Sequence, residues 1–321
     1  MDKRITALMA ALMATLVPQA ADAQFPDLAD LSVQYLPGVE LNDLPGARAQ
    51  VASYEVSLNV PIVLNKHTFL IPGLAYHADA ISYAEAPATF EDLRSFHSLD
   101  LALLFVRLLP KDFSFSLRVA GGIAGDLQRV DARQIRLSFV GLVTHAFSAR
   151  LVLGGGAIGS YAFGSFLPLP ALYLDWKPKD ALRIEGFLPA FLNVTYTIAG
   201  RFELGLRAEV TGNAYGVRTS AIDQAWPCAG ATVDDPTTSV DERIPEASQC
   251  LDHVAYSVAL AGPRVGVRLF SDVWLTAFAG YSFYRRVEQM NRNDDPIEGG
   301  DDQLPNTVFF RAALTWRLPS G

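Results

Sequence analysis

The sequence predicts an all-β fold: a transmembrane, antiparallel, up-and-down β-barrel of outer-membrane type, with about fourteen strands. Three observations carry this prediction. The chain of 321 residues opens with a leader typical of exported proteins, half of it is hydrophobic without a spanning helix, and apolar residues alternate with polar ones over many long segments. Inside a bilayer, only helices and closed barrels satisfy all their backbone hydrogen-bonding groups.

The leader has the three parts of a secretory signal peptide. Lys3 and Arg4 form a basic start, residues 5–17 are apolar and uncharged, and Ala21-Asp22-Ala23 is a small-residue cleavage site. A membrane anchor is the alternative, but the apolar run is too short to span comfortably. We therefore expect a signal peptide over residues 1–23 and one barrel domain over residues 24–321.

The composition fits a barrel. Hydrophobic residues make up 50% of the chain and charged residues 19%, yet no later apolar stretch reaches transmembrane-helix length. The longest candidate, residues 99–109, is interrupted by Asp100 and Arg107. A barrel needs apolar residues only on its lipid-facing side, which explains the combination. A net charge of −8 argues against nucleic acid as a partner.

The strands are predicted from a period of two. In residues 202–210 every second residue is apolar, beginning with Phe202, and Glu203, Arg207 and Glu209 stand between. The same alternation runs through residues 55–64, 98–105, 113–123, 135–143 and 307–318. Such runs suit a tilted strand that crosses a bilayer in about 9–11 residues. The core of a soluble sandwich would not accept these charges.

The polar faces of these strands are predicted to line the lumen. The charged residues on them carry both signs: Asp100, Arg118, Arg136, Arg183, Glu185, Glu203, Arg207, Glu209, Arg268, Arg311 and Arg317. They could line a water-filled pore and set its selectivity. They could equally pair with one another and fill the lumen.

The connections alternate in length. Short turns are expected at residues 65–67, 110–112, 147–148, 177–180, 199–200 and 271–272, and longer polar segments at 84–95, 125–133, 160–167, 217–252 and 287–305. Outer-membrane barrels have short periplasmic turns and longer outer loops. Counting from Leu31, with a tight hairpin near Pro189, gives fourteen strands and two periplasmic termini. Twelve is the alternative, because the first strand and the pair around Pro189 are short.

The leader, the hairpin spacing and the final strand TVFFRAALTWRL resemble Gram-negative outer-membrane β-barrels. The segment from PLPALYLDWK to RAEVTG, residues 168–212, is similar to a family of barrel proteins of unknown function. The resemblance implies the fold, a place in the cell outer membrane, and outer-membrane lipid and the barrel assembly machinery as partners. It implies no activity. Such barrels commonly end on an aromatic residue, whereas here Leu318 closes the strand.

The sequence motifs that could support catalysis, cofactor binding or metal binding are weak. Gly154, Gly156 and Gly159 match G-x-G-x-x-G, but no helix follows, so we expect glycine to relieve crowding in a bent strand. His77 and Asp79 share an inner face and could form a site with a serine from another strand. No pair of histidines has metal-ligand spacing. We therefore expect no enzyme, cofactor or metal site.

Two features lie in the outer loops. Cys228 and Cys250 fall in one polar segment, and in an exported protein such a pair most often forms a disulfide. The segments 217–252 and 287–305 are acidic, which favours solvated loops, with divalent-cation binding as the alternative.

The leading functional hypothesis is a passive, porin-like channel or uptake pore for small solutes. The alternatives are a closed barrel that binds a ligand at the cell surface and a lipid-modifying enzyme.

Overall fold

The computed structural model describes residues 26–41, 44–84, 95–127, 130, 132–162, 165–217, 252–290 and 296–318. Within these ranges the chain is almost entirely strand, with one 3-10 helix, η2 (Ala132–Gln134). No helix in the described ranges is long and apolar enough to cross a membrane. The signal peptide, residues 1–23, lies outside them and remains a prediction.

The sixteen strand segments belong to one sheet. Their bounds are β1 (Ala29–Leu41), β2 (Leu44–Asn59), β3 (Ile62–Asn65), β4 (Thr68–Ala84), β5 (Ser95–Leu108), β6 (Phe113–Gly125), β7 (Ile135–Ser148), β8 (Leu151–Ala162), β9 (Ser165–Lys179), β10 (Leu182–Leu188), β11 (Phe191–Ile198), β12 (Phe202–Gly216), β13 (His253–Phe270), β14 (Val273–Met290), β15 (Pro296–Gln303) and β16 (Val308–Trp316).

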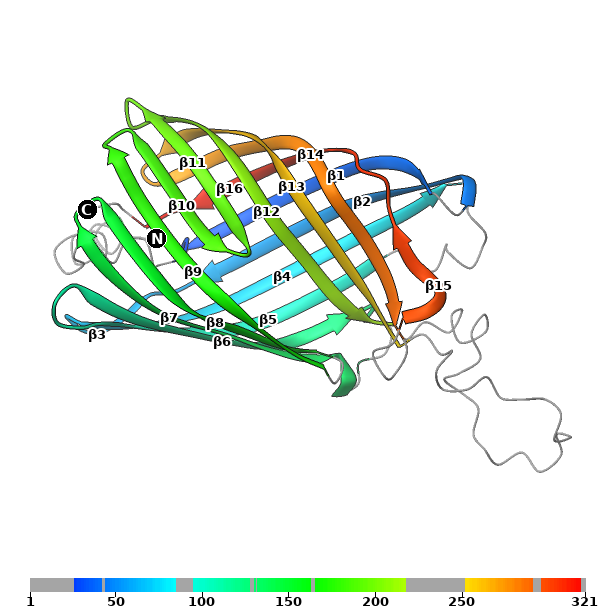
Figure 1. Ribbon diagram of the computed structural model, residues 1–321, viewed down its shortest axis with the longest axis horizontal. Helices are drawn as coiled ribbons and strands as arrows, with labels where there is room; N and C mark the ends of the chain where they lie inside the picture. Colours follow the sequence, from blue (N-terminus) through cyan, green and yellow to red (C-terminus); the bar gives the residue numbers. More distant parts are fainter. Residues whose placement is uncertain are drawn as a thin grey trace, which may run out of the picture.

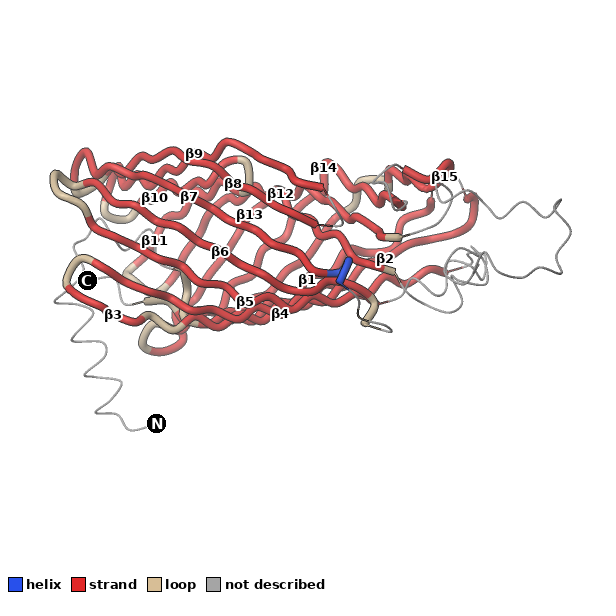
Figure 2. Tube along the Cα trace, turned by 90° about the horizontal axis from the view of Figure 1, so that it is seen from below, coloured by secondary structure: helices blue, strands red, loops and turns tan. Residues whose placement is uncertain are grey.

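The sheet closes on itself as a barrel (Figures 1 and 2). β1 pairs with β2 on one side and β16 on the other, and β16 pairs with β14, each time antiparallel. β3 continues β2 beyond Val60 and Pro61 and pairs with the same neighbour, β4. β15 pairs with β14 beyond the stretch of β14 that pairs with β16. The described ring therefore has fourteen strands, so the prediction of fourteen is confirmed and the alternative of twelve is wrong.

The two ends of the barrel differ. β1 begins and β16 ends beside the turn between β13 and β14, where the Arg317 amide donates to the Asp272 carbonyl. The six predicted short turns, such as the one between β5 and β6, lie at this same end, which we call the turn end (Figure 1). The opposite end, which we call the loop end, receives the longer connections. Two of these are shorter than predicted, because β15 lies within segment 287–305 and β8 and β9 extend into segment 160–167.

The outer surface of the wall is apolar, as the alternation predicts. Leu101 is 68% exposed and Leu206 is 64% exposed. Similar exposed side chains occur on most strands, among them Val33, Val56, Leu74, Val119, Leu137, Leu153, Leu172, Leu192, Val265, Leu275 and Phe310. An apolar surface of this size would be unfavourable in contact with water. The inward neighbours on the same strands are polar, small or buried.

The interior of the loop-end half is packed. Fully buried inward side chains form an apolar core: Leu36, Val51, Ile81, Phe96, Ala124, Tyr215, Val254, Val258, Leu260, Phe278 and Phe309. These residues come from β1, β2, β4, β5, β6, β12, β13, β14 and β16, and in the described chain none comes from β7 to β11. The loop-end half therefore contains a narrower, filled ring.

A backbone contact between β12 and β6, which we call the bridge, closes the narrow ring at the loop end. Gly216 pairs with Gly125 in parallel orientation, and the Asp126 amide donates to the Gly216 carbonyl at 3.1 Å. A Cβ atom on Gly125 would overlap the Gln134 side chain and lie 2.8 Å from the Gly216 oxygen. Glycine at 125 is therefore needed for this close approach.

The wall is interrupted beside this bridge. The β10–β11 hairpin turns at Pro189, as predicted, but its strands have only 7 and 8 residues. It ends well short of the loop ends of β9 and β12 (Figure 1). β9 pairs with β10 only as far as Leu172, and β12 pairs with β11 only as far as Glu209. The next seven residues of each strand extend beyond the hairpin.

Candidate functional site in the barrel lumen

The lumen is the candidate site, and its charged side chains pair with one another. Of the predicted set, all but Arg118 and Arg268 meet an oppositely charged inward side chain in the described chain. The pairs fall into four groups, which draw on strands far apart in the sequence. The interpretation that the charges partly fill the lumen is therefore favoured over a wide water-filled pore.

The first group is built around Asp79 on β4, which is 2% exposed. Its carboxylate accepts the Ser53 hydroxyl at 2.5 Å and the Tyr215 hydroxyl at 2.6 Å, and lies 3.1 Å from His77 Nε2. The predicted neighbours His77 and Asp79 therefore do meet a serine from another strand. However, the serine and the histidine each contact the Asp79 carboxylate, which lies between them. A hydrolytic triad places histidine between serine and acid.

The second group links the Asp79 cluster to an ion pair between Arg136 and Asp100. Arg136 forms a two-pronged ion pair with Asp100, with Nε donating to Oδ1 at 2.9 Å. Arg136 also donates to the Asn213 side chain, and Asn213 donates to the Tyr215 hydroxyl at 3.0 Å. A continuous hydrogen-bonded chain therefore runs between Asp100 and Asp79, across β5, β7, β12 and β4. Such a chain holds the lumen side chains in one arrangement.

The third group gathers arginines around two glutamates on β12. Glu203 accepts both terminal nitrogens of Arg317, at 2.6 and 3.0 Å, and one nitrogen of Arg264 at 3.2 Å. The Arg317 guanidinium also lies 4.4 Å from the Trp274 ring centre, a cation–π distance. Both glutamate oxygens are thus held by charged donors.

Glu209, six residues further along β12, makes the matching contacts. One carboxylate oxygen lies 2.6 Å from Arg207 and the other 2.8 Å from Arg311. Arg311 also donates to the Gln34 amide oxygen, at 2.9 Å from Nε. The last strand is therefore tied to both β12 and β1 through the lumen.

The fourth group lies on β9 and β10. Arg183 donates to Asp175 at 2.8 Å and lies 3.6 Å from Glu185. Asp175 was not predicted, although its inward position follows from the strand alternation. Five further lumen residues were not predicted either: Ser53, Gln34, Asn213, Tyr215 and Arg264. Nothing in the local sequence says that these positions meet across the barrel.

Arg118 differs from the other predicted lumen arginines. It is half-buried on β6, and no carboxylate in the described chain lies within ion-pair distance of it. Its cross-strand neighbours on the two sides are Leu104 and Val140, both apolar. Asp100, the carboxylate nearest in register, is already held by Arg136. A guanidinium left without a carboxylate in a partly enclosed site can hold an anionic group of a ligand.

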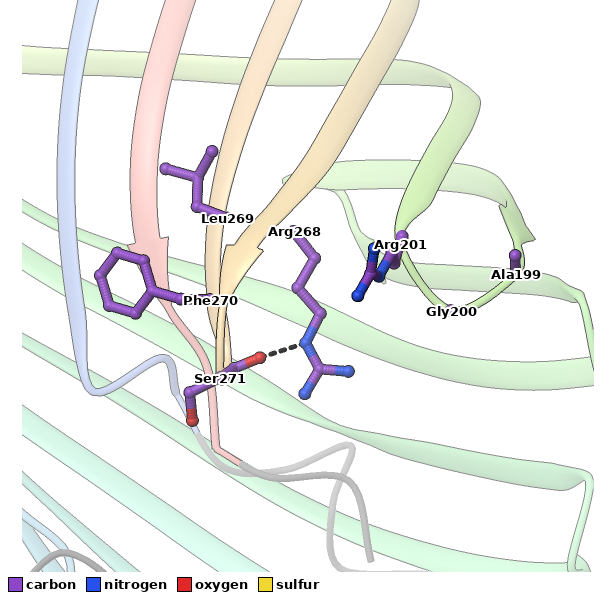
Figure 3. Close-up of a pocket in the computed structure, with 7 residues that line it drawn as sticks. All are labelled: Ala199, Gly200, Arg201, Arg268, Leu269, Phe270 and Ser271. Carbon is purple, nitrogen blue, oxygen red and sulfur yellow. Dashed lines mark hydrogen bonds between the residues drawn. The ribbon is translucent and has the colours of Figure 1, made fainter. Parts of the chain in front are cut away.

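Arg268 lies at the rim rather than deep in the lumen. It pairs with Asp272 at 2.9 Å and donates to the Ser271 carbonyl. With Arg201 and the turn at Gly200 it borders a shallow pocket of about 400 Å³ at the turn end (Figure 3). The pocket is open and Arg268 is engaged, so its geometry identifies no ligand.

Local geometry explains the glycine motif. Gly154, Gly156 and Gly159 lie in strand β8, where a Cβ atom on Gly156 would overlap the Gly141 carbonyl. Close backbone approach, as expected, explains glycine there. Within the described ranges no group of three metal-ligating side chains occurs. Cys228, Cys250 and most of segment 217–252 lie outside these ranges, so their disulfide remains a prediction.

Comparison with known proteins gives one family. The family described as "Domain of unknown function (DUF6268)" matches residues 19–226, more than half of the chain. No curated protein matches.

Solved outer-membrane proteins are similar at low identity. A mutant of TodX, a monoaromatic hydrocarbon channel of Pseudomonas putida, has 9% identity and a TM-score of 0.43, with 95% of this chain and 94% of that chain covered. The COG4313 outer membrane channel of Pseudomonas putida F1 has 9% identity, 93% and 99% coverage and a TM-score of 0.39. LpxR of Salmonella typhimurium has 10% identity, 90% and 99% coverage and a TM-score of 0.33. The strand pairing of the chain itself establishes the barrel.

Proposed function

This chain belongs to the DUF6268 family, and we propose that its barrel is a narrow channel in the cell outer membrane for small solutes that carry an anionic group. The apolar outer surface supports the location, because a closed ring with hydrocarbon outside and charges inside suits a bilayer. Outer-membrane lipid and the barrel assembly machinery are the partners that this location requires. The channel acts by passage, without an enzyme activity or cofactor.

The observation that carries the proposal is the unpaired guanidinium of Arg118. Each of the other arginines deep in the predicted lumen already meets a carboxylate, so these side chains neutralise one another. Among the predicted lumen arginines that the structure describes, Arg118 is the one that offers an unneutralised positive charge to a solute, and it does so between apolar neighbours, where the field of a charge is screened less than in water. The packed loop-end core keeps the pathway narrow and its conductance small.

Single-channel recording tests this function. The refolded mature protein in a planar bilayer should conduct in small steps and prefer anions. Arg118→Glu should lower the anion-to-cation permeability ratio by about tenfold, because one reversed charge in a narrow site changes the solute free energy by roughly 1–2 kcal/mol. Arg118→Lys is the matched control and should keep the preference.

Two results would contradict the channel. One is silence from protein that circular dichroism and gel mobility show to be folded. The other is a permeability ratio that Arg118→Glu leaves unchanged.

A second candidate is favoured by the packed loop end. The core of Phe96, Tyr215, Val258 and their neighbours leaves the loop-end half of the interior filled, which suits a closed barrel that binds a ligand through its outer loops. Deleting residues 221–248 should then abolish ligand binding while the barrel still folds. The lipid-enzyme hypothesis gains no support from Asp79, whose contacts lack a histidine placed against the serine.

A further inference from the structure

We infer that the barrel wall has a lateral opening between β9 and β12, and that a small anionic amphiphile dissolved in the bilayer reaches the lumen through it. The inference rests on the proposed function and deepens it, because it names the solute class and the route. Four observations carry it: the interrupted ladder, the residues along its edge, an apolar row behind the edge, and the packed loop end.

The ladder is interrupted over a defined stretch. Beyond the tip of the β10–β11 hairpin, residues 165–171 of β9 and 211–215 of β12 pair with no strand on the facing side in the described chain. The hairpin tip bounds this stretch at one end. The Gly125–Gly216 bridge bounds it at the other. The interruption is therefore a window between β9 and β12, with the loop end of β12 fixed against β6, rather than a frayed end.

The edge of β9 is adapted to lack a partner. The Lys177 amide donates to the Arg150 carbonyl of the β7–β8 turn, and the β8–β9 register then runs without a shift. Odd-numbered residues of β9 thus turn their N–H groups toward β8, and even-numbered ones toward the window. Positions 168 and 170 are prolines, which carry no N–H. Two donors that would face lipid without an acceptor are therefore absent.

An apolar row leads from this edge to the free guanidinium. Leu169, between the two prolines, faces inward and pairs with Ile158 on β8, which pairs with Val140 on β7. Val140 pairs with Arg118 on β6. All four side chains are half-buried and stand outside the packed core. Three strand spacings make the row about 14 Å long, with hydrocarbon at the window and a cation at its inner end.

One inward residue at the window is open in a way that its counterparts at the loop end are not. Leu167, on the inner face of β9, is 57% exposed, whereas Phe96 and Tyr215, inward at the same end of the barrel, are 2% and 1% exposed. The loop-end interior is thus packed and narrow, whereas the inner face of β9 is open at Leu167. A molecule with an apolar chain and an anionic head fits the row from Leu169 to Arg118.

Lipid access to Leu169 tests the opening. Leu169→Cys carries a bimane fluorophore, in a background with Cys228→Ser and Cys250→Ser, in vesicles that contain phosphatidylcholine with a nitroxide on its acyl chain. Leu104→Cys is the matched control, because it replaces a half-buried inward leucine on the other side of Arg118. Leu204→Cys is the lipid-facing reference, at 50% exposure.

The nitroxide lipid should quench the label at 169 at least threefold more than the label at 104, and nearly as well as the label at 204. Equal quenching at 169 and 104 would overturn the opening. If the double-serine background does not fold, the label is introduced with Cys228 and Cys250 retained, and the labelling of the unsubstituted protein is subtracted. This readout needs no conductance, so it can succeed where the channel recordings fail.

The solute class has its own test. An alkyl carboxylate with a nitroxide on its chain should quench the label at 169 several-fold more than the same chain with a trimethylammonium head. Arg118→Gln should remove that difference and leave quenching by the nitroxide phospholipid unchanged. A difference that survives in Arg118→Gln would overturn the assignment of the anionic head to Arg118.

Discussion

Gly216 at the end of β12 pairs with Gly125 at the end of β6, although five strands of the wall, β7 to β11, stand between them in chain order. The contact is possible because the β10–β11 hairpin is short and leaves β12 free to cross toward β6. It divides the interior into a packed loop-end ring and a charged lumen below. The same contact forms one border of the window.

The bridge should fail when Gly125 gains a side chain. In Gly125→Ala the new Cβ atom would overlap Gln134 and crowd the Gly216 oxygen. We expect a loss of about 1–3 kcal/mol in the free energy of unfolding, as for other overpacked sites, and a larger channel conductance. Urea unfolding from vesicles, followed by tryptophan fluorescence, measures the first effect, and single-channel recording measures the second.

Gly38→Ala on β1 is the control, because its added Cβ atom would have ordinary contacts at 3.8 and 3.9 Å. A stability loss in Gly125→Ala no larger than in this control would show that the bridge is not tightly packed.

Glu203 should be a main stabilising residue of the lumen. Glu203→Gln leaves Arg264 and Arg317 without their shared carboxylate, and breaking a buried ion pair from one side costs about 3 kcal/mol or more. Asp180→Asn removes a pair of similar length, 2.9 Å, whose side chains are 58% and 91% exposed. That change should cost less than about 1 kcal/mol. Equal losses in the two variants would mean that water reaches the Glu203 group freely.

We expect the Tyr215 hydroxyl to stabilise the folded barrel. It donates to Asp79 and accepts from Asn213, inside the loop-end core. Tyr215→Phe removes a donor from a buried carboxylate, which costs about 1–3 kcal/mol. Tyr35→Phe removes an exposed hydroxyl that donates to Gln50 at 3.0 Å, and should change the unfolding free energy by less than about 0.5 kcal/mol. A larger loss of unfolding free energy in Tyr35→Phe than in Tyr215→Phe would contradict this expectation.

The strands and their lipid-facing sides could be predicted because each depends on a local period of two. Phe202, Leu204 and Leu206 face outward for the same reason that Glu203 and Arg207 face inward. The strand count followed from turn residues such as Lys111 and Asp112. The inward position of Arg118 was predicted in the same way.

The partners of the lumen residues could not be predicted, since they depend on shear and on which strands face one another. Glu203 meets Arg317, 114 positions away, and Tyr215 meets Asp79, 136 positions away. No local pattern encodes these distances. The isolation of Arg118 is equally hidden, because it requires knowing that Asp100 is taken by Arg136. The strand β15 inside an acidic segment also escaped prediction, since its pairing with β14 overrides its weak β-propensity.

The two prolines on the window edge provide the last prediction. Pro168→Val combined with Pro170→Val restores two N–H groups that point toward the window, where the described chain offers no acceptor. An amide without an acceptor in a bilayer costs several kcal/mol, and partial hydration at the rim reduces this cost, so we expect a loss of at least about 1 kcal/mol in unfolding free energy. Leu172→Val is the control, because it changes a lipid-facing side chain at the first β9 position that pairs with β10. Valine is otherwise the better strand residue. A more stable double variant would therefore mean that the edge is paired and the window closed.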